Sequence, residues 1–513
     1  MSPAPEGPSE GTPPSHRRPG RVSTALALVC ATFAAACETD GSSPPPGRLF
    51  FPTAMALAPD GTHLFVASSN FDLSFNRGAL HSYDLDVLNA SVDRCPERIA
   101  TEETVDSPEE CQFIPTQDGR IELVEQGAVE QVAGLLVSQV QIGSFTDGVA
   151  VAPAGNRLYL PVRGDANLTF VDIQDGGALF CGEGTGAVAG PDAFERCESV
   201  YSRVDESFAN ARDVNLPNDP VGVTTGLIQD LLPAESEALA GDYVLFAHRG
   251  GSVSLFFDRD RDGNPASLEP PRLVDRLDGI GQLLIDVSVD PATQFGWLAS
   301  QSTIGVQRFG IGIEELTSTD EDAIFAQLER TSLYRTTTLF FAGLDAASGF
   351  GDVRSVAFDP RPDVDRAYLL NRSPNALLIA DPSAEPDELR VLRRIPVGLG
   401  PSKLQVREFP VEGRTLAFVS CFDSVDVWVI DVDLGVLVGI VRNLGGPFEI
   451  EVDVPRRRAY VLDFVASTVR VVDLAPMLAC LSGEAAGDPM ADGECSPRLL
   501  GILGRPQARD ELN

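Results

Sequence analysis

The stretch VAFDPRPDVDRAYLLNRSPNALLIAD, residues 356–381, holds three short apolar strand patterns joined by turns rich in Pro, Asp and Asn. The same order of strand and turn recurs about seven times between Phe51 and Leu474. One such unit cannot bury its own apolar faces, so neighbouring units must pack against one another. The sequence therefore predicts one array of small β-sheets.

The repeats have a regular internal order. Their first strands are expected to include Ala56, Val149, Val221, Val287, Val356, Leu404 and Ile450. In six of the seven repeats the third strand ends near an aspartate: Asp84, Asp172, Asp258, Asp381, Asp431 and Asp473. This pattern predicts an all-β fold, a seven-bladed β-propeller of four-stranded antiparallel blades with short helices only in inserts. One helix is expected near Asp320–Arg330, where Ser318 and Glu321 match a capping box.

The chain is strongly acidic. Its 513 residues include 75 acidic and 39 basic side chains, which give a formal charge of −36. Phosphate backbones would be repelled, so nucleic acid is excluded as a partner. Lys403 is the only lysine, and we interpret this as a bias in composition.

The N-terminal segment has the pattern of an export signal. Arginines precede an apolar run, Val22–Ala36, which is too short to span a bilayer and ends in small residues directly before Cys37. This resembles a bacterial lipoprotein signal, which implies cleavage before Cys37 and lipidation of its thiol. The alternative is ordinary secretion. We expect a signal peptide at 1–36, a lipidated tether at 37–47, the propeller at 48–505 and a tail at 506–513.

Six cysteines fall into three couples of similar spacing, each in an insert that follows a third strand. In an exported chain this pattern predicts the local disulfides Cys95–Cys111, Cys181–Cys197 and Cys480–Cys495. Zinc is the rival interpretation, but no Cys-x-x-Cys motif and no nearby histidine supports it. Cys421 lies within a strand pattern and is expected to be a buried free thiol.

The phrases AYVLDFVASTVRVVDLAP (459–476) and AYLLNRSPNALLIAD (367–381) resemble the YVTN-type repeats of bacterial surface propellers, which are related in structure to lactonase-like seven-bladed propellers. The resemblance covers nearly all of residues 51–505. It implies the propeller fold. It says little about function, because propellers carry many unrelated sites.

One acidic loop has the spacing of a calcium site. Asp258, Asp260 and Asp262 alternate before Gly263, and Glu269 follows at the position of a closing ligand. Alternating carboxylates can converge on one cation, so Ca²⁺ is the one candidate cofactor. The alternative is a solvated acidic turn.

Three arginines, Arg163, Arg249 and Arg372, each stand near the end of a second strand, where they would project on one face of the ring. They are candidates for an anion site, because the guanidinium fork suits carboxylates and phosphates. Pairing with neighbouring acids is the alternative. His248 beside Arg249 is the one candidate catalytic pair, against a structural role for this histidine in the turn.

These observations favour a binding or interaction module with no catalytic residues. The module would be a lipid-anchored propeller at the bacterial cell envelope, periplasmic or facing the surface, with a protein or a small molecule as its partner. One alternative is a lactonase-like hydrolase with His248 and Arg249 at the channel mouth. Another is a scaffold for other envelope proteins.

Overall fold

The computed structural model divides the chain into two compact units, residues 1–42 and 43–513. It describes residues 42–94, 112–114, 130–182, 194–203, 215–232, 241–259, 269–302, 305–313, 321–343, 351–383, 388–483 and 495–505. The predictions at Cys37, Cys95, Cys111, Asp260 and Asp262 lie outside these ranges. Within them, no helix has the length and apolar character needed to cross a membrane.

The unit 43–513 is built from antiparallel sheets. Among the described residues the strands pair into six sheets, one of which consists of two antiparallel halves joined by a single parallel pair. We divide that sheet at the parallel pair and call the resulting groups blades 1 to 7. Blade 1 consists of β1 (Pro52–Leu57), β2 (His63–Ser68), β3 (Gly78–Asp84) and β6 (Leu136–Ile142), and blade 2 of β7 (Ala150–Val151), β8 (Arg157–Val162) and β9 (Asn167–Ile173) with β10 (Leu179–Phe180) and β11 (Ser202–Arg203). Blade 3 consists of β12 (Pro220–Leu227), β13 (Asp242–His248), β14 (Ser252–Asp258) and β15 (Arg272–Leu277). Blade 4 consists of β16 (Leu284–Val289), β17 (Gly296–Ser300), β18 (Val306–Gly312) and β19 (Ser332–Gly343).

Blades 5 to 7 are the most regular. Blade 5 consists of β20 (Gly351–Phe358), β21 (Ala367–Ser373), β22 (Asn375–Asp381) and β23 (Glu388–Pro396). Blade 6 consists of β24 (Pro401–Phe409), β25 (Arg414–Cys421), β26 (Asp426–Asp431) and β27 (Val436–Val441). Blade 7 consists of β28 (Pro447–Asp453), β29 (Arg458–Asp463), β30 (Thr468–Asp473) and β31 (Arg498–Leu503). Two short strands, β4 (Gln112–Ile114) and β5 (Glu130–Gln131), lie outside this order.

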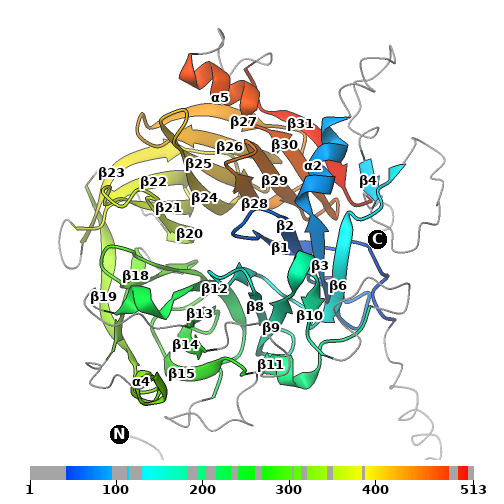
Figure 1. Ribbon diagram of the computed structural model, residues 1–513. Coiled ribbons are helices and arrows are strands. Elements are labelled where there is room, and N and C mark those ends of the chain that lie inside the picture. Colours follow the sequence, from blue (N-terminus) through cyan, green and yellow to red (C-terminus); the bar gives the residue numbers. More distant parts are fainter. Residues whose placement is uncertain are drawn as a thin grey trace, which may run out of the picture. The chain divides into compact units, whose positions relative to one another are not determined.

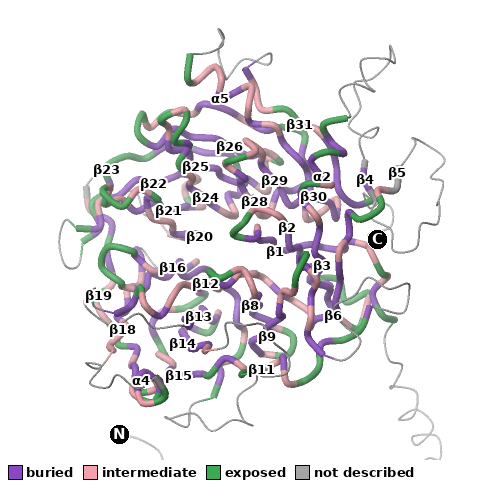
Figure 2. The backbone as a smooth tube through the Cα atoms, viewed as in Figure 1, coloured by how far each residue is buried: buried purple, intermediate pink, exposed green. Residues whose placement is uncertain are grey.

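The blades stand around a common centre (Figure 1). The first strand of each blade contacts the first strands of its neighbours, and β1 contacts β28, so the ring is closed. The second strands are buried almost throughout, as in β8, β13 and β25 (Figure 2). Apolar clusters fill the space between neighbouring blades. The predicted all-β propeller of four-stranded antiparallel blades is confirmed.

The aspartates that end the third strands stabilise their own blades in two ways. Asp172 lies opposite Arg157 on the neighbouring strand, and the Arg157 Nε atom is 2.6 Å from its Oδ1 atom. Asp473 and Arg458 repeat this arrangement in blade 7, also at 2.6 Å. Asp84 instead caps the helix that follows it, because its side chain accepts a hydrogen bond from the Val87 backbone. The repeated Asp is therefore a structural element of the repeat.

The inserts carry the helices and the disulfides. The helices α2 (Leu85–Asp93), α4 (Glu321–Leu328) and α5 (Ala475–Ser482) all follow third strands, and the expected helix near residues 320–330 is α4. Three short 3-10 turns, η2 (Asp175–Gly177), η3 (Ser199–Tyr201) and η4 (Ile228–Leu231), complete the helical elements of the described residues. The disulfides Cys181–Cys197 and Cys480–Cys495 are present as predicted, and Cys421 is a buried free thiol.

Some blades are also joined at their outer edges. β4, which belongs to the insert of blade 1, pairs in parallel with β31 of blade 7. β19 and β23 join blades 4 and 5 in the same way. At the junction of blades 1 and 7, Leu49 packs in one apolar cluster with Val469 and Leu503. The segment before β1 therefore helps to close the ring.

Candidate functional site in the central channel

The first strands share one irregularity. In β1, β12, β16, β20, β24 and β28 the pairing with the second strand shifts by one residue near the strand start. The residues that follow this bulge occupy equivalent positions, and Gly148 is their counterpart in blade 2, between the pairs Thr146–Val162 and Ala150–Tyr159. We call this set the Lys403 layer: Ala54, Gly148, Gly222, Asp286, Ser355, Lys403 and Glu449.

Side chains of the Lys403 layer meet inside the ring. The Nζ atom of Lys403 in blade 6 is 3.9 Å from Oδ1 of Asp286 in blade 4 and 3.8 Å from Oε1 of Glu449 in blade 7. Ser355 in blade 5 donates a hydrogen bond of 2.7 Å to Oδ2 of Asp286. The lysine can reach past blade 5 only across the interior, so these residues face the central channel.

The ammonium group of Lys403 is placed between carboxylates but is not bonded to them. Both separations exceed hydrogen-bond length, and no acceptor among the described residues bonds to Nζ. The Lys403 side chain remains 24% exposed, and those of Asp286 and Glu449 are 12% and 15% exposed. The ammonium donors are therefore available to a molecule that enters the channel.

The electrostatics of the layer are strongly coupled. Burial lowers the pKa of Lys403, but Asp286, Glu449 and nearby carboxylates outweigh burial and raise it to about 12. Burial raises the pKa of Glu449 to about 7, although Lys403 and a hydrogen bond from the Met55 backbone oppose this shift. Lys403 thus stays charged, while Glu449 exchanges a proton near neutral pH.

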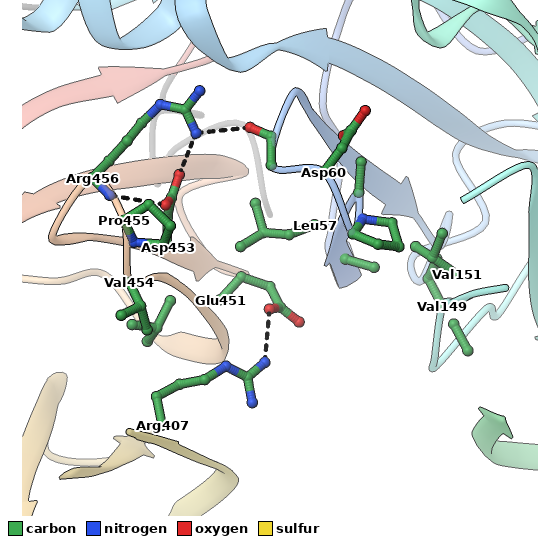
Figure 3. Close-up of a pocket in the computed structure, with 16 residues that line it drawn as sticks. Leu57, Asp60, Val149, Val151, Arg407, Glu451, Asp453, Val454, Pro455 and Arg456 are labelled. Atoms are coloured by element: carbon green, nitrogen blue, oxygen red, sulfur yellow. Dashed lines mark hydrogen bonds and ion pairs between the residues drawn. The ribbon is translucent and has the colours of Figure 1, made fainter. Parts of the chain in front are cut away.

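A second polar layer lies two residues further along the strands. Gln405 donates a hydrogen bond of 2.8 Å to Oε2 of Glu451, and Arg407 is 3.7 Å from the same oxygen. Beyond them a pocket of about 790 Å³ opens between β1, β7, β24 and β28. Figure 3 shows Arg407 and Glu451 pointing toward each other on one side of this pocket, with Val149 and Val151 on the other.

The three predicted arginines do not form one site. Arg163 donates to Asp147 at 2.8 Å and to Asp219 at 3.2 Å. Burial raises the pKa of Asp147, and the positive charges of Arg163 and Arg249 oppose this shift. Arg372 pairs with Asp423, on another part of the ring, at 3.1 Å. Arg163 and Arg249 thus gather around Asp147, whose charge also acts on Lys403.

The candidate catalytic histidine is enclosed. His248 is fully buried, with Nδ1 3.2 Å from the backbone oxygen of Asn218 and Nε2 2.8 Å from the Ser254 hydroxyl. Burial lowers the pKa of His248 to about 4, so the ring is neutral at physiological pH. Both ring nitrogens already have partners, which is the arrangement of a structural histidine.

Two of the four predicted calcium ligands are described. Asp258 is buried, and its carboxylate accepts hydrogen bonds from Arg157 at 2.7 Å and from the Tyr159 hydroxyl at 2.8 Å. The backbone oxygen of Glu269 is 3.4 Å from the same guanidinium. Among the described residues no group of three potential metal ligands is found. Since Asp260 and Asp262 lie outside the described ranges, the calcium loop stays a prediction.

Sequence reasoning missed the residues of the Lys403 layer, although a signal was present. Lys403, Gln405 and Arg407 alternate with apolar residues in β24, and Glu449 and Glu451 do so in β28. Polar side chains at alternate positions of an inner strand must face the channel. The single lysine therefore marks the polar layer of the channel, and its interpretation as a bias in composition missed this.

No family model and no curated protein sequence matches the chain. Similar solved structures include a putative 6-phosphogluconolactonase from Bacteroides uniformis, with 13% identity, a TM-score of 0.43, and coverage of 75% of this chain and 83% of that one. The periplasmic gluconolactonase PpgL of Pseudomonas aeruginosa has 15% identity and a TM-score of 0.45, over 78% and 87% of the two chains. Hydrazine synthase of Kuenenia stuttgartiensis has 12% identity and a TM-score of 0.47, over 85% and 97%.

Proposed function

We propose that this protein is a cell-envelope β-propeller that binds a small, neutral, hydroxyl-rich solute in its central channel. The observation that carries the proposal is the ammonium of Lys403, 3.8 and 3.9 Å from two carboxylates and without a bonded acceptor among the described residues. A hydroxyl group accepts a hydrogen bond from an ammonium and donates one to a carboxylate. Several hydroxyls on one small molecule would bridge Lys403, Asp286 and Glu449 together.

The charge of the layer favours a neutral ligand. Lys403 offsets one of the two carboxylates, and burial raises the pKa of the second, Glu449, to about 7, which favours its neutral form. An anionic ligand would meet Asp286 and Glu449, and a cationic one would meet Lys403. The pocket of about 790 Å³ is lined by Arg407 and Glu451 of the second polar layer and has the size of a site for a small molecule, but Lys403, Asp286 and Glu449 are not among its lining residues.

Envelope location belongs to the same proposal. The apolar run before Cys37 is the pattern of a lipoprotein signal. The disulfides at Cys181–Cys197 and Cys480–Cys495 are typical of an oxidising compartment. We infer that the propeller is exported and anchored through a lipid on Cys37, and we expect Cys37→Ser to release it from membranes.

The binding proposal is tested with neutral monosaccharides as probes. Calorimetry of the full chain with D-glucose, D-galactose and D-mannose should detect binding by at least one of them. Lys403→Met should weaken that binding tenfold or more, because the ammonium donor is lost. Arg390→Met, at an exposed position on β23, is the matched control and should bind like the parent. Equal binding by Lys403→Met and the parent would refute the channel site.

A second candidate is hydrolysis of a sugar lactone, and the pKa of Glu449 favours it. A carboxylate with a pKa of about 7 can accept a proton from water as the water attacks the lactone carbonyl. Lys403 would stabilise the negative charge that forms on the carbonyl oxygen. Glucono-δ-lactone should then open faster than its spontaneous rate, and Glu449→Gln should abolish the excess. If the parent shows no excess rate, the hydrolase is excluded while binding is not.

A further inference from the structure

A second cavity lies between blades 1 and 2, away from the Lys403 layer. It has a volume of about 480 Å³, and its lining includes Arg77 and Arg196 together with Asp165, Asn167, Ser199 and Ser202. Arg77 directly precedes β3 of blade 1, whereas Arg196 belongs to the disulfide-bonded insert of blade 2. Two guanidinium groups from different blades thus share one cavity.

The insert is held in place by blade 1. Arg196 forms a parallel bridge with Gln141 at the end of β6. The Gln141 backbone donates to the oxygen of Glu195 at 2.8 Å, and the Cys197 backbone donates to the oxygen of Gln141 at 3.1 Å. The Cys181–Cys197 disulfide ties this short segment back to blade 2. The disulfide and these backbone hydrogen bonds therefore fix the segment that carries Arg196.

The two arginines that line this cavity differ from those that form ion pairs. Many other described arginines pair with a carboxylate, for example Arg163 with Asp147 and Arg361 with Asp433. No ion pair or side-chain hydrogen bond joins Arg77 or Arg196 to another described residue. Burial and the nearby charge of Arg196 lower the pKa of Arg77, while Asp165 opposes this shift. The cavity thus holds two guanidinium groups, which Asp165 offsets only in part.

We propose that Arg77 and Arg196 bind the phosphate group of a small phosphate monoester. Two planar guanidinium forks offer at least four N–H donors, which exceeds what the two oxygens of a carboxylate need and suits the three free oxygens of a phosphate monoester. Ser199, Ser202 and Asn167 add neutral donors in the lining. A volume of about 480 Å³ leaves room for the group that the phosphate is attached to. Asp165 reduces the net charge of the lining to one positive unit, so we expect modest affinity.

The probes are inorganic phosphate and glycerol 3-phosphate, titrated calorimetrically into the full chain at low and constant ionic strength. Glycerol 3-phosphate should bind, and inorganic phosphate should bind more weakly if the ester group occupies the rest of the cavity. Arg77→Gln and Arg196→Gln should each weaken binding about tenfold, because each removes a charged donor pair. Arg390→Gln changes the charge equally outside the cavity and should bind like the parent.

The disulfide supplies an independent test. The double variant Cys181→Ser/Cys197→Ser should lose binding, while Cys480→Ser/Cys495→Ser should keep it, with folding checked by circular dichroism. Equal binding of both probes by the parent, Arg77→Gln and Arg196→Gln would place the anion elsewhere and overturn the proposal. Absence of binding by the parent would overturn it as well.

Discussion

The two halves of the Lys403 layer differ in what fixes their residues. In blades 1 to 3 the layer is small, with Ala54, Gly148 and Gly222. A Cβ atom on Gly222 would lie 2.9 Å from the Cα atom of Asp286, and one on Gly148 would lie 2.9 Å from Val223. Packing of the inner strands therefore dictates the small half.

The polar half, in blades 4 to 7, is not dictated in this way. Its charged side chains are partly exposed, and Lys403 makes no hydrogen bond to a described residue. Burying charge opposes folding unless the charge is well paired. One half of the channel thus maintains the ring, and the other half is available to a ligand.

The largest expected effect comes from filling the small half. Gly222→Ala should lower the free energy of unfolding by about 1–3 kcal/mol, because the new methyl group meets backbone atoms that cannot move separately from blade 4. Denaturant titration measures the change. Gly250→Ala, where a Cβ atom would meet nothing within 4 Å, is the control and should be nearly neutral. If Gly222→Ala left the free energy of unfolding unchanged, packing would not be what requires small residues in this half of the layer.

A smaller effect should follow from protonation in the polar half. The pKa of Glu449 is raised by folding, so its contribution to stability is complete below the unfolded value and is lost as pH rises through about 7. We expect about 1–2 kcal/mol less stability from this group at pH 8 than at pH 5, after allowance for partial exposure. Glu449→Gln should remove that part of the pH dependence. Exposed Glu408→Gln should leave it in place, and identical profiles for parent and Glu449→Gln would contradict the assignment.

The smallest effect concerns the reactivity of the single lysine. Asp286 and Glu449 raise the pKa of Lys403, so the free amine is scarce at pH 9. Asp286→Asn should increase the rate of acetylation at residue 403 by about threefold to tenfold, measured by peptide mass spectrometry. Ala54→Ser, in the small half, serves as the control. Should both variants react at the parent rate, the two halves would not differ electrostatically.

Much of the fold could be predicted because its signals are local. Turns such as DPRPDVDR and the aspartates that end third strands recur in the regular blades. They specify β21 and β22 almost to the residue, whereas β20 begins at Gly351, five residues before the expected start at Val356. The pairs Cys181–Cys197 and Cys480–Cys495 are also local, since each lies within one insert. Local spacing was therefore sufficient for both.

The candidate site could not be predicted in the same way, because it is assembled from separate blades. Asp286, Lys403 and Glu449 are distant in sequence and meet only when the ring closes. His248 shows the same dependence on neighbouring strands. Its place at the end of β13 left both a catalytic and a structural role open, and its ring bonds to Ser254 inside the blade. Strand position gives the face of a blade, whereas the bonded partners of a side chain depend on the neighbouring strands.

The pairing of β4 with β31 has a consequence for the order of assembly. Phe113 lies beside Leu503, so one partner is made early in synthesis and the other almost last. Pairing over such a sequence distance is slow, and an unpaired strand edge invites association with other chains. The edge of β4 must stay protected from other chains until β31 has been synthesised and pairs with it. This protein is therefore most prone to aggregation before the last blade forms. A chain truncated before residue 498 would keep the edge of β4 unpaired and would remain prone to aggregation.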